Sequence, residues 1–275
     1  MQHHAACNVQ EPQWYPTRLL DLGESPASTG TVRLVLKDID HLSGPYVTLS
    51  HCWGTAEFLT LNTTNFEILR AGISILELPQ TFQNAIVVTR RFGIRYLWID
   101  SICIMQDLES DWQVESLLME KVFSRGHCSI AATASSDSAG GLFRRRDPKL
   151  LCPIEIIQPV TTDGPDQVTA KRYTAYDRDC WRRGLDKAPL CRRAWVVQER
   201  LLAHRVVHFT HRELVWECKE LTASETHPSG APIYGVLFSR DLDGRPGSKW
   251  TAPDANSRVP YSAWSRIQAF YYACA

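Results

Sequence analysis

The sequence has no excess of charge of either sign, because 30 Lys and Arg balance 30 Asp and Glu. Without a basic excess or an acidic tail, the composition points neither to a nucleic-acid partner nor to a strongly basic one. The chain also lacks an apolar run of about 18 residues, so we expect no membrane span. Its opening residues, MQHHAACNVQ, lack the basic and apolar segments of a secretory leader. These absences lead us to expect a cytoplasmic protein.

The nine cysteines are spread along the chain and include no CxxC pair. An odd number without paired spacing argues against a disulfide framework and against a zinc ribbon, so we expect reduced, mostly buried thiols. The sequence contains neither GxGxxG nor GxxxxGK[ST], and therefore lacks the Rossmann and P-loop phosphate signatures. We expect no metal site and no required cofactor.

A set of histidines, cysteines and one aspartate leaves two further chemistries open, a Cys–His nucleophilic pair and a zinc site. No nucleophile motif accompanies these residues, and their spacing differs from that of the usual zinc sites. Buried cysteine is therefore the simpler expectation. The residues concerned are His51, Cys52, Asp100, Cys103, His127 and Cys128.

Hydrophobic patterning predicts alternating strands and helices from residue 45 onward. PYVTLSHCWG, the strand in GIRYLWIDSICIMQD, and HCSIAATA read as apolar strands. Between them lie two helical stretches, one from Pro79 to a C-cap at Gly93 and one that ends at Gly126. This order predicts a mainly parallel sheet flanked by helices. Further on we expect a β-rich insertion at about 144–190, a helix in CRRAWVVQERLLAH and a C-terminal hairpin in RVVHFTHRELVWEC.

Four long motifs occur in order along the chain: YVTLSHCWG; LPQTFQNAIVVTRRFGIRYLWIDSICIMQD; DWQVESLLMEKVFSRGHCSIAATAS followed by GGLF; and RAWVVQERLLAHRVVHFTHRELVWEC. In this order they resemble the heterokaryon-incompatibility (HET) domain of filamentous fungi, over roughly Arg18 to Cys218. The resemblance implies a role in non-self recognition and regulated cell death. It divides the chain into a lead-in at 1–44 with an edge strand or two, a HET domain at 45–218, and a loop-rich extension of the same globule at 219–275.

HET domains have also been compared with TIR domains, which adopt a flavodoxin-like fold. Some TIR domains self-associate and hydrolyse NAD through one glutamate. The comparison therefore implies a flavodoxin/TIR-like α/β fold, NAD as a candidate substrate, and a partner that is a second copy or another death-signalling protein. The alternative is a non-enzymatic signalling module that acts by homotypic association.

The TIR glutamate lies on a helix that begins W-x-x-x-E-L, and WVVQERLL places Glu199 four residues after Trp195. Helical spacing puts Trp195, Glu199 and Leu202 on one face, where apolar neighbours raise the pKa of a carboxyl group. A carboxylate of this kind suits glycosidic cleavage. The alternative is a surface residue paired with Arg192, Arg193 or Arg200.

Glu115 is a second catalytic candidate, because it falls inside the apolar stripe of its helix. A carboxylate there must be paired, protonated or part of a site. The alternative role is structural, with the carboxylate fixing its helix against Arg95 or the HCWG loop.

Polar residues follow the first two predicted strands, where carboxyl ends of parallel strands form a ligand-binding edge. We expect Trp53 to stack on a base or nicotinamide ring and Asp100 to hold ribose hydroxyls. Alternatively, Asp100 and Ser101 satisfy backbone amides around HCWG. The residues expected to converge on this edge, together with Trp195, are Ser50, His51, Trp53, Asp100, Ser101 and Gln106.

Overall fold

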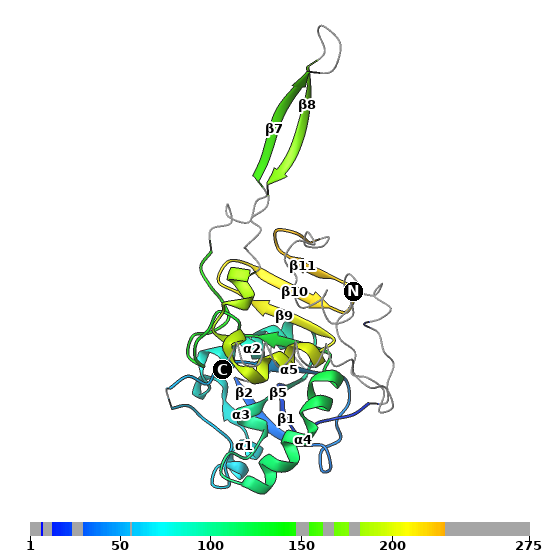
Figure 1. Ribbon diagram of the computed structural model, residues 1–275. Helices are drawn as coiled ribbons and strands as arrows, with labels where there is room; N and C mark the ends of the chain where they lie inside the picture. The colour runs from blue at the N-terminus through cyan, green and yellow to red at the C-terminus, as the bar shows by residue number, and fades with distance from the viewer. Residues whose placement is uncertain are drawn as a thin grey trace.

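The structure is a computed structural model that describes residues 7, 13–23, 30–55, 57–146, 154–161, 168–175 and 182–228. Within these residues the chain forms one large mixed sheet flanked by helices, and a separate two-stranded hairpin (Figure 1). The strand order of the large sheet is β11-β10-β9-β6-β3-β5-β1-β2-β4. The predicted α/β class is therefore confirmed. No helix in the described part of the chain is both long enough and apolar enough to cross a bilayer.

The centre of the sheet is parallel. β3 (Tyr46–Ser50) lies between β5 (Tyr96–Ile99) and β6 (Cys128–Ala131), and β9 (Arg205–Phe209) pairs with the other side of β6. Every residue of β3, β5 and β6 is buried, as expected for parallel strands covered on both faces. The three apolar runs of the sequence are therefore confirmed as central strands.

Antiparallel strands flank this centre on both sides. The lead-in was expected to supply edge strands, but β1 pairs with both β5 and β2 and is buried along its whole length. The predicted C-terminal hairpin is confirmed, because β9 pairs antiparallel with β10 around a turn at residues 210–213. The flanking strands are β1 (Arg18–Asp21), β2 (Thr31–Leu36), β4 (Ile73–Ser74), β10 (Leu214–Cys218) and β11 (Thr222–Ser224).

Crossover helices connect the parallel strands. The two long predicted helices are present as α2 and α4, and Gly93 follows α2 with a φ of 70°, a conformation that glycine adopts without strain. The helices are α1 (Phe66–Ala71), α2 (Gln80–Arg91), α3 (Asp100–Cys103), α4 (Glu109–Arg125) and α5 (Ala194–Leu202), with shorter turns η2 (Ile75–Glu77), η4 (Arg182–Asp186) and η5 (Leu190–Arg192).

The helices cover opposite faces of the sheet. Val47 and Leu49 of β3 belong to the core cluster that contains Phe82 of α2. Tyr46, whose side chain points the other way, belongs to the cluster that contains Val122 of α4, against which a leucine of α5 also packs. From β3 the chain continues to β5, which pairs with one side of β3. It then crosses back to β6, which pairs with the other side of β3. β3 and β6 therefore flank the topological switch point of the parallel sheet, where ligands bind in open α/β folds.

The β-rich insertion is confirmed by β7 (Ile154–Thr161) and β8 (Val168–Ala175), which pair with each other around the sequence TTDGPDQ. Figure 1 shows this hairpin standing away from the large sheet. The residues from 229 onward, which make up most of the predicted loop-rich extension at 219–275, lie outside the described residues.

Candidate functional site

The carboxyl end of β3 sends consecutive side chains to opposite faces of the sheet. Ser50 is in phase with Tyr46 and therefore lies on the face covered by α4 and α5. His51 turns to the other face, where its ring meets Phe82 of α2 edge-on, with 4.8 Å between centroids. Both residues are buried. The end of one strand thus supplies a polar group to each side of the sheet.

Glu199 reaches the same edge from the middle of α5. It is only 8% exposed. Burial raises the pKa of its carboxyl group to about 7, although a hydrogen bond with the Ser50 side chain acts in the opposite direction. The Asp100 carboxylate raises this pKa further, and Arg193 lowers it. Glu199 is therefore a buried carboxyl group with a raised pKa, and not the surface residue of the alternative interpretation.

Two charged residues surround this carboxyl group. Arg193, the residue just before α5, donates a hydrogen bond from Nη1 to the carbonyl oxygen of His51. Asp100 follows β5 directly and accepts a hydrogen bond from Trp53 Nε1 at 2.9 Å. Glu199, Asp100 and Arg193 thus bring two acidic groups and one guanidinium to the carboxyl edge of β3 and β5.

His51 is buried without a hydrogen-bond partner on either ring nitrogen among the described residues. Its Nδ1 lies 3.6 Å from Asp100 Oδ1, which is too far for a good hydrogen bond. Burial lowers the pKa of its imidazole, with Asp100 opposing and Arg193 reinforcing that shift. A neutral, unsatisfied imidazole in a core costs stability unless a water or ligand binds it.

The loop after β6 closes against the loop after β3. Gly54 has a φ of 74°, and a Cβ placed on it would lie 2.4 Å from the Cβ of Asp137. Only glycine fits there, which explains why the HCWG motif ends at this residue. Trp53 also packs edge-on against Phe58, with 5.7 Å between the ring centroids. The loops after β3, β5 and β6 therefore meet at one edge.

A comparison of the sequence with family models matches the heterokaryon incompatibility protein (HET) family over residues 46–199. This match covers more than half of the chain and includes β3, α2, β5, α4, β6 and Glu199. The chain belongs to the HET family. No curated protein and no solved structure matches the chain significantly. Membership points to a role in fungal heterokaryon incompatibility and cell death.

The second central strand of this HET domain ends sooner than predicted, one residue before Asp100. β5 stops at Ile99, and Asp100 and Ser101 begin the short helix α3 instead of continuing the strand. Among the described residues, Asp100 accepts hydrogen bonds from the Ser101 amide and the Trp53 indole, and from no backbone amide of HCWG. Ser101 is fully buried and its Oγ has no partner among the described residues.

Gln106 and Trp195 do not face the cluster. The Gln106 side-chain amide donates to the carbonyl oxygens of Ile104 and Asp100, and so holds its own loop. Trp195 is 54% exposed, whereas Glu199 is buried. Trp195 and Glu199 lie one turn apart on α5, so the same side of the helix is exposed at its start and buried at Glu199.

Glu115 of the HET domain lies in a different place. It is buried on α4, and its carboxylate lies 3.8 Å from Arg18 Nη1 of β1. Burial raises the pKa of this carboxyl group, while a hydrogen bond with Thr17 and the charge of Arg18 lower it. The expected structural partners were Arg95 and the HCWG loop, and both were wrong. Its observed contacts hold α4 against the lead-in.

The histidines and cysteines considered for nucleophilic or zinc chemistry do not assemble. His51 and Cys52 lie at the carboxyl edge, whereas His127 and Cys128 lie at the amino end of β6. Burial raises the pKa of Cys103 to about 12, which makes it a poor nucleophile. Among the described residues, no group of three or more His, Cys, Asp or Glu is arranged to hold a metal.

Sequence reasoning missed the network that fixes α5. Arg200 donates two hydrogen bonds to the Glu217 carboxylate of β10, at 2.6 and 2.5 Å, and both residues are buried. His208 Nε2 lies 2.9 Å from the same carboxylate, and its Nδ1 lies 3.0 Å from Thr133 Oγ1. Arg200 thus ties α5 to β9 and β10. Its neighbour Glu199 points towards Ser50, because adjacent residues on a helix are about 100° apart.

Proposed function

We propose that this HET domain cleaves the nicotinamide–ribose bond of NAD in a self-assembled state, with Glu199 as the catalytic carboxylate. The observation that supports this most strongly is a buried carboxyl group with a pKa of about 7, beside Ser50 at the switch point of a parallel sheet. Strongly shifted acids in such positions are characteristic of active sites. The TIR-like chemistry suggested by the motif W-x-x-x-E agrees with this placement.

The surrounding residues suit a substrate that carries a pyridinium ring. The Trp53 ring is half-buried and held by Asp100 and Phe58, so it offers a fixed aromatic surface. The carboxylate of Asp100 favours the positive charge of nicotinamide before the bond breaks. His51 and Ser101 supply buried polar atoms that have no hydrogen-bond partner within the described part of the chain, and ribose hydroxyls or ordered water would satisfy them.

The proposed reaction needs only water as co-reactant. The bond between ribose C1′ and the ring nitrogen breaks, and its electron pair leaves with nicotinamide, which becomes neutral. The positive charge that develops on the ribose is stabilised by the Glu199 carboxylate. Water then adds to C1′ and loses one proton, giving ADP-ribose, nicotinamide and H⁺. Ionised Glu199 is the active form, so turnover rises as the pH rises through about 7.

We place the reaction in an assembled state because Glu199 has little access to solvent in the single chain. Glu199 is nearly closed to solvent in the single chain, while Trp53 and Asp100 are only partly covered. A substrate must therefore enter from their side, and the entrance must widen when chains associate. The same dependence on assembly is expected from the comparison with TIR domains.

Exposed apolar side chains favour a second candidate function, homotypic association without catalysis. Leu117 of α4 is 83% exposed and Trp112 is 51% exposed, and α5 adds the exposed Trp195. Exposed apolar residues on neighbouring helices are characteristic of interaction surfaces. Light scattering of the wild-type protein and of a Trp112→Ser, Leu117→Ser double variant would test this function. Equal masses at every concentration would contradict it.

The decisive experiment measures NAD consumption by purified protein at high concentration and under crowding. Wild type is compared with Glu199→Gln and with Glu115→Gln, a matched control in which a second buried carboxyl group with a raised pKa is removed elsewhere in the fold. We expect loss of turnover only in Glu199→Gln. No turnover by assembled wild type, or equal loss in both folded variants, would contradict the proposal.

A further inference from the structure

Two cysteines that are far apart in the sequence lie against each other beside the C-terminal hairpin. Cys7 belongs to the lead-in, and Cys218 is the last residue of β10. Their thiols share a hydrogen bond, and the Cys7 thiol also accepts one from the backbone N–H of Lys219. Both cysteines are buried, and both are present as thiols. Neither residue has a role in the proposed NAD site.

Backbone contacts place Cys7 beside Cys218 independently of the two thiols. The carbonyl oxygen of Cys7 accepts a hydrogen bond from the guanidinium of Arg205, the first residue of β9. Arg205 lies directly opposite Cys218 in the antiparallel pairing of β9 and β10. The Cys218 side chain is oriented by the backbone N–H of Leu221, which donates to its Sγ at 3.2 Å. The two cysteines are therefore held next to each other by separate elements of the fold.

This arrangement meets the geometric needs of a disulfide. The two sulfur atoms must move from hydrogen-bond contact to a bond length of about 2.05 Å, a movement within reach of side-chain rotation. Cys128 of β6 is a poorer partner for Cys218, because β9 lies between their strands. Two strand spacings amount to about 10 Å, beyond the Cα separation of about 7 Å that a disulfide can span. Cys7 is therefore the partner that the fold offers to Cys218.

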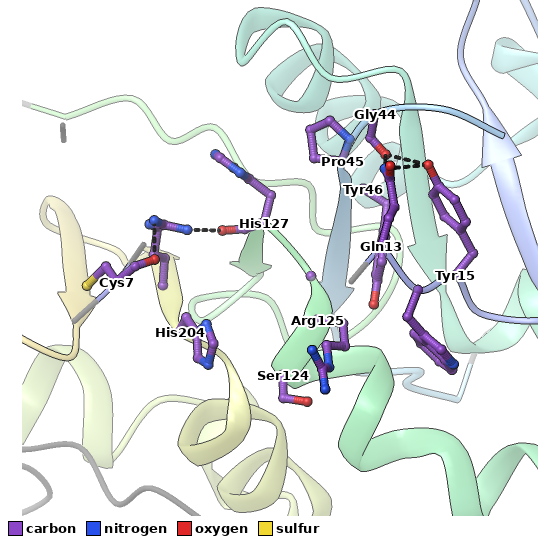
Figure 2. Close-up of a pocket in the computed structure, with 13 residues that line it drawn as sticks. Cys7, Gln13, Tyr15, Gly44, Pro45, Tyr46, Ser124, Arg125, His127 and His204 are labelled. Carbon is purple, nitrogen blue, oxygen red and sulfur yellow. Dashed lines mark hydrogen bonds between the residues drawn. The ribbon is translucent and has the colours of Figure 1, made fainter. Parts of the chain in front are cut away.

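A pocket of about 350 Å³ gives small molecules access to this pair. It lies where β3 and β6 begin, and its described lining includes Cys7 but not Cys218. Figure 2 shows Cys7 on the same side of the pocket as His127 and His204. Hydrogen peroxide is little larger than water, which occupies about 30 Å³ in the liquid, so it enters such a space. An oxidant in the pocket therefore meets Cys7 first.

We propose that Cys7 and Cys218 are a redox modification site, which a peroxide converts into a disulfide. The Cys7 thiolate attacks one oxygen of hydrogen peroxide and becomes a sulfenic acid; the O–O bond breaks, and the departing hydroxide takes up the thiol proton as water. The Cys218 sulfur then attacks the Cys7 sulfur, whose S–O bond breaks, and the second hydroxide leaves as water with the Cys218 proton. Two sulfurs lose two electrons, and one peroxide gives two waters. This inference does not rest on NAD hydrolysis.

The surroundings of the pair set its response to oxidant and what the bond does. Burial and the Cys218 thiol raise the pKa of Cys7, whereas the Lys219 amide and the charge of Arg205 lower it. The thiolate is the reactive form, so the site responds to sustained oxidant and not to traces. The disulfide joins the lead-in to the end of β10, next to Glu217, which pairs with α5. Oxidation therefore locks the hairpin in the position that holds α5.

Treatment of the reduced, folded protein with hydrogen peroxide tests the proposal. The remaining thiols are alkylated with N-ethylmaleimide in denaturant and counted by intact-protein mass spectrometry. We expect two fewer alkylated cysteines than the nine of the reduced chain, and full recovery after dithiothreitol. Peptide mapping without reductant should then join Cys7 to Cys218. This measurement uses the wild-type protein, so it decides the proposal even where a cysteine variant fails to fold.

Three variants assign the roles of the two sulfurs. Cys7→Ala and Cys218→Ala should each abolish the disulfide, whereas Cys128→Ala, which removes another buried cysteine, should keep it. Dimedone, which traps sulfenic acids, should label Cys7 in Cys218→Ala, because the resolving thiol is missing. No disulfide in the wild-type protein, a bond that joins other cysteines, or a disulfide that persists in Cys7→Ala would overturn the proposal.

Discussion

Replacing Glu199 with glutamine should stabilise the protein at alkaline pH while abolishing NAD hydrolysis. In the folded chain the pKa of this carboxyl group is about 7, compared with an ordinary value of 4.5. The folded state therefore keeps a proton that the unfolded state releases between about pH 4.5 and 7, so stability falls as the pH rises through this window. A pKa raised from 4.5 to about 7 lowers the unfolding free energy by roughly 3 kcal/mol at pH 8. Glutamine keeps the shape of the side chain without the charge.

Urea denaturation at about pH 5 and about pH 8 measures this effect. The gap in unfolding free energy between Glu199→Gln and wild type should widen by about 2 to 3 kcal/mol from the lower to the higher pH. Other titrating groups, including His51, contribute to both proteins and cancel in the difference. A gap that stays constant with pH would refute the raised pKa. A gap that widens while NAD turnover survives would refute the catalytic role and leave the buried acid as structural.

Three further changes separate catalysis from folding, and each is checked by chemical denaturation and by NAD turnover in the assembled state. Glu115→Gln should leave turnover at the wild-type rate, and a large loss would move the proposed site to α4. Gly54→Ala should cost about 1–3 kcal/mol and reduce turnover, because it combines a positive φ with a steric clash; Gly93→Ala has a similar φ in open space and should cost less. Glu217→Gln leaves the buried Arg200 without its carboxylate and should cost about 3–5 kcal/mol, and a loss under 1 kcal/mol would contradict that pairing.

The parallel centre of the sheet was predictable because its strands are uniformly apolar and its helices carry clear end signals. Pro79 and Gly93 bracket α2, and the run from Tyr96 to Ile99 is buried on both faces. The position of β1 was not predictable in the same way. A short apolar segment near the start of a chain fits an edge or an interior position equally well, and only long-range pairing with β5 decides between them.

The candidate site was predictable only where chain direction fixes it. Ser50, His51 and Asp100 could be placed at one edge, because parallel strands end together. The outward position of Trp195 was not predictable, since helical spacing gives the relation between residues but not how far the sheet covers the helix. The pairing of Arg200 with Glu217 depends on the β9–β10 hairpin, which returns the chain to α5 and brings together two residues 17 positions apart. No local pattern specifies such a pair.

The helix α5 connects the two edges of the sheet. It has nine residues, so it is about 13 Å long, close to the length of the parallel strand that it crosses. Arg193 at its start contacts the His51 carbonyl, whereas His204 and Arg205 beyond its end line a pocket at the amino ends of β3 and β6. The carboxyl group of Glu199 lies at the same edge as the His51 carbonyl, beside Ser50. One buried pair, Arg200 with Glu217, sets the position of this helix against the sheet. A single helix therefore places the acidic group at one edge, and the residues just after it, His204 and Arg205, lie at the other.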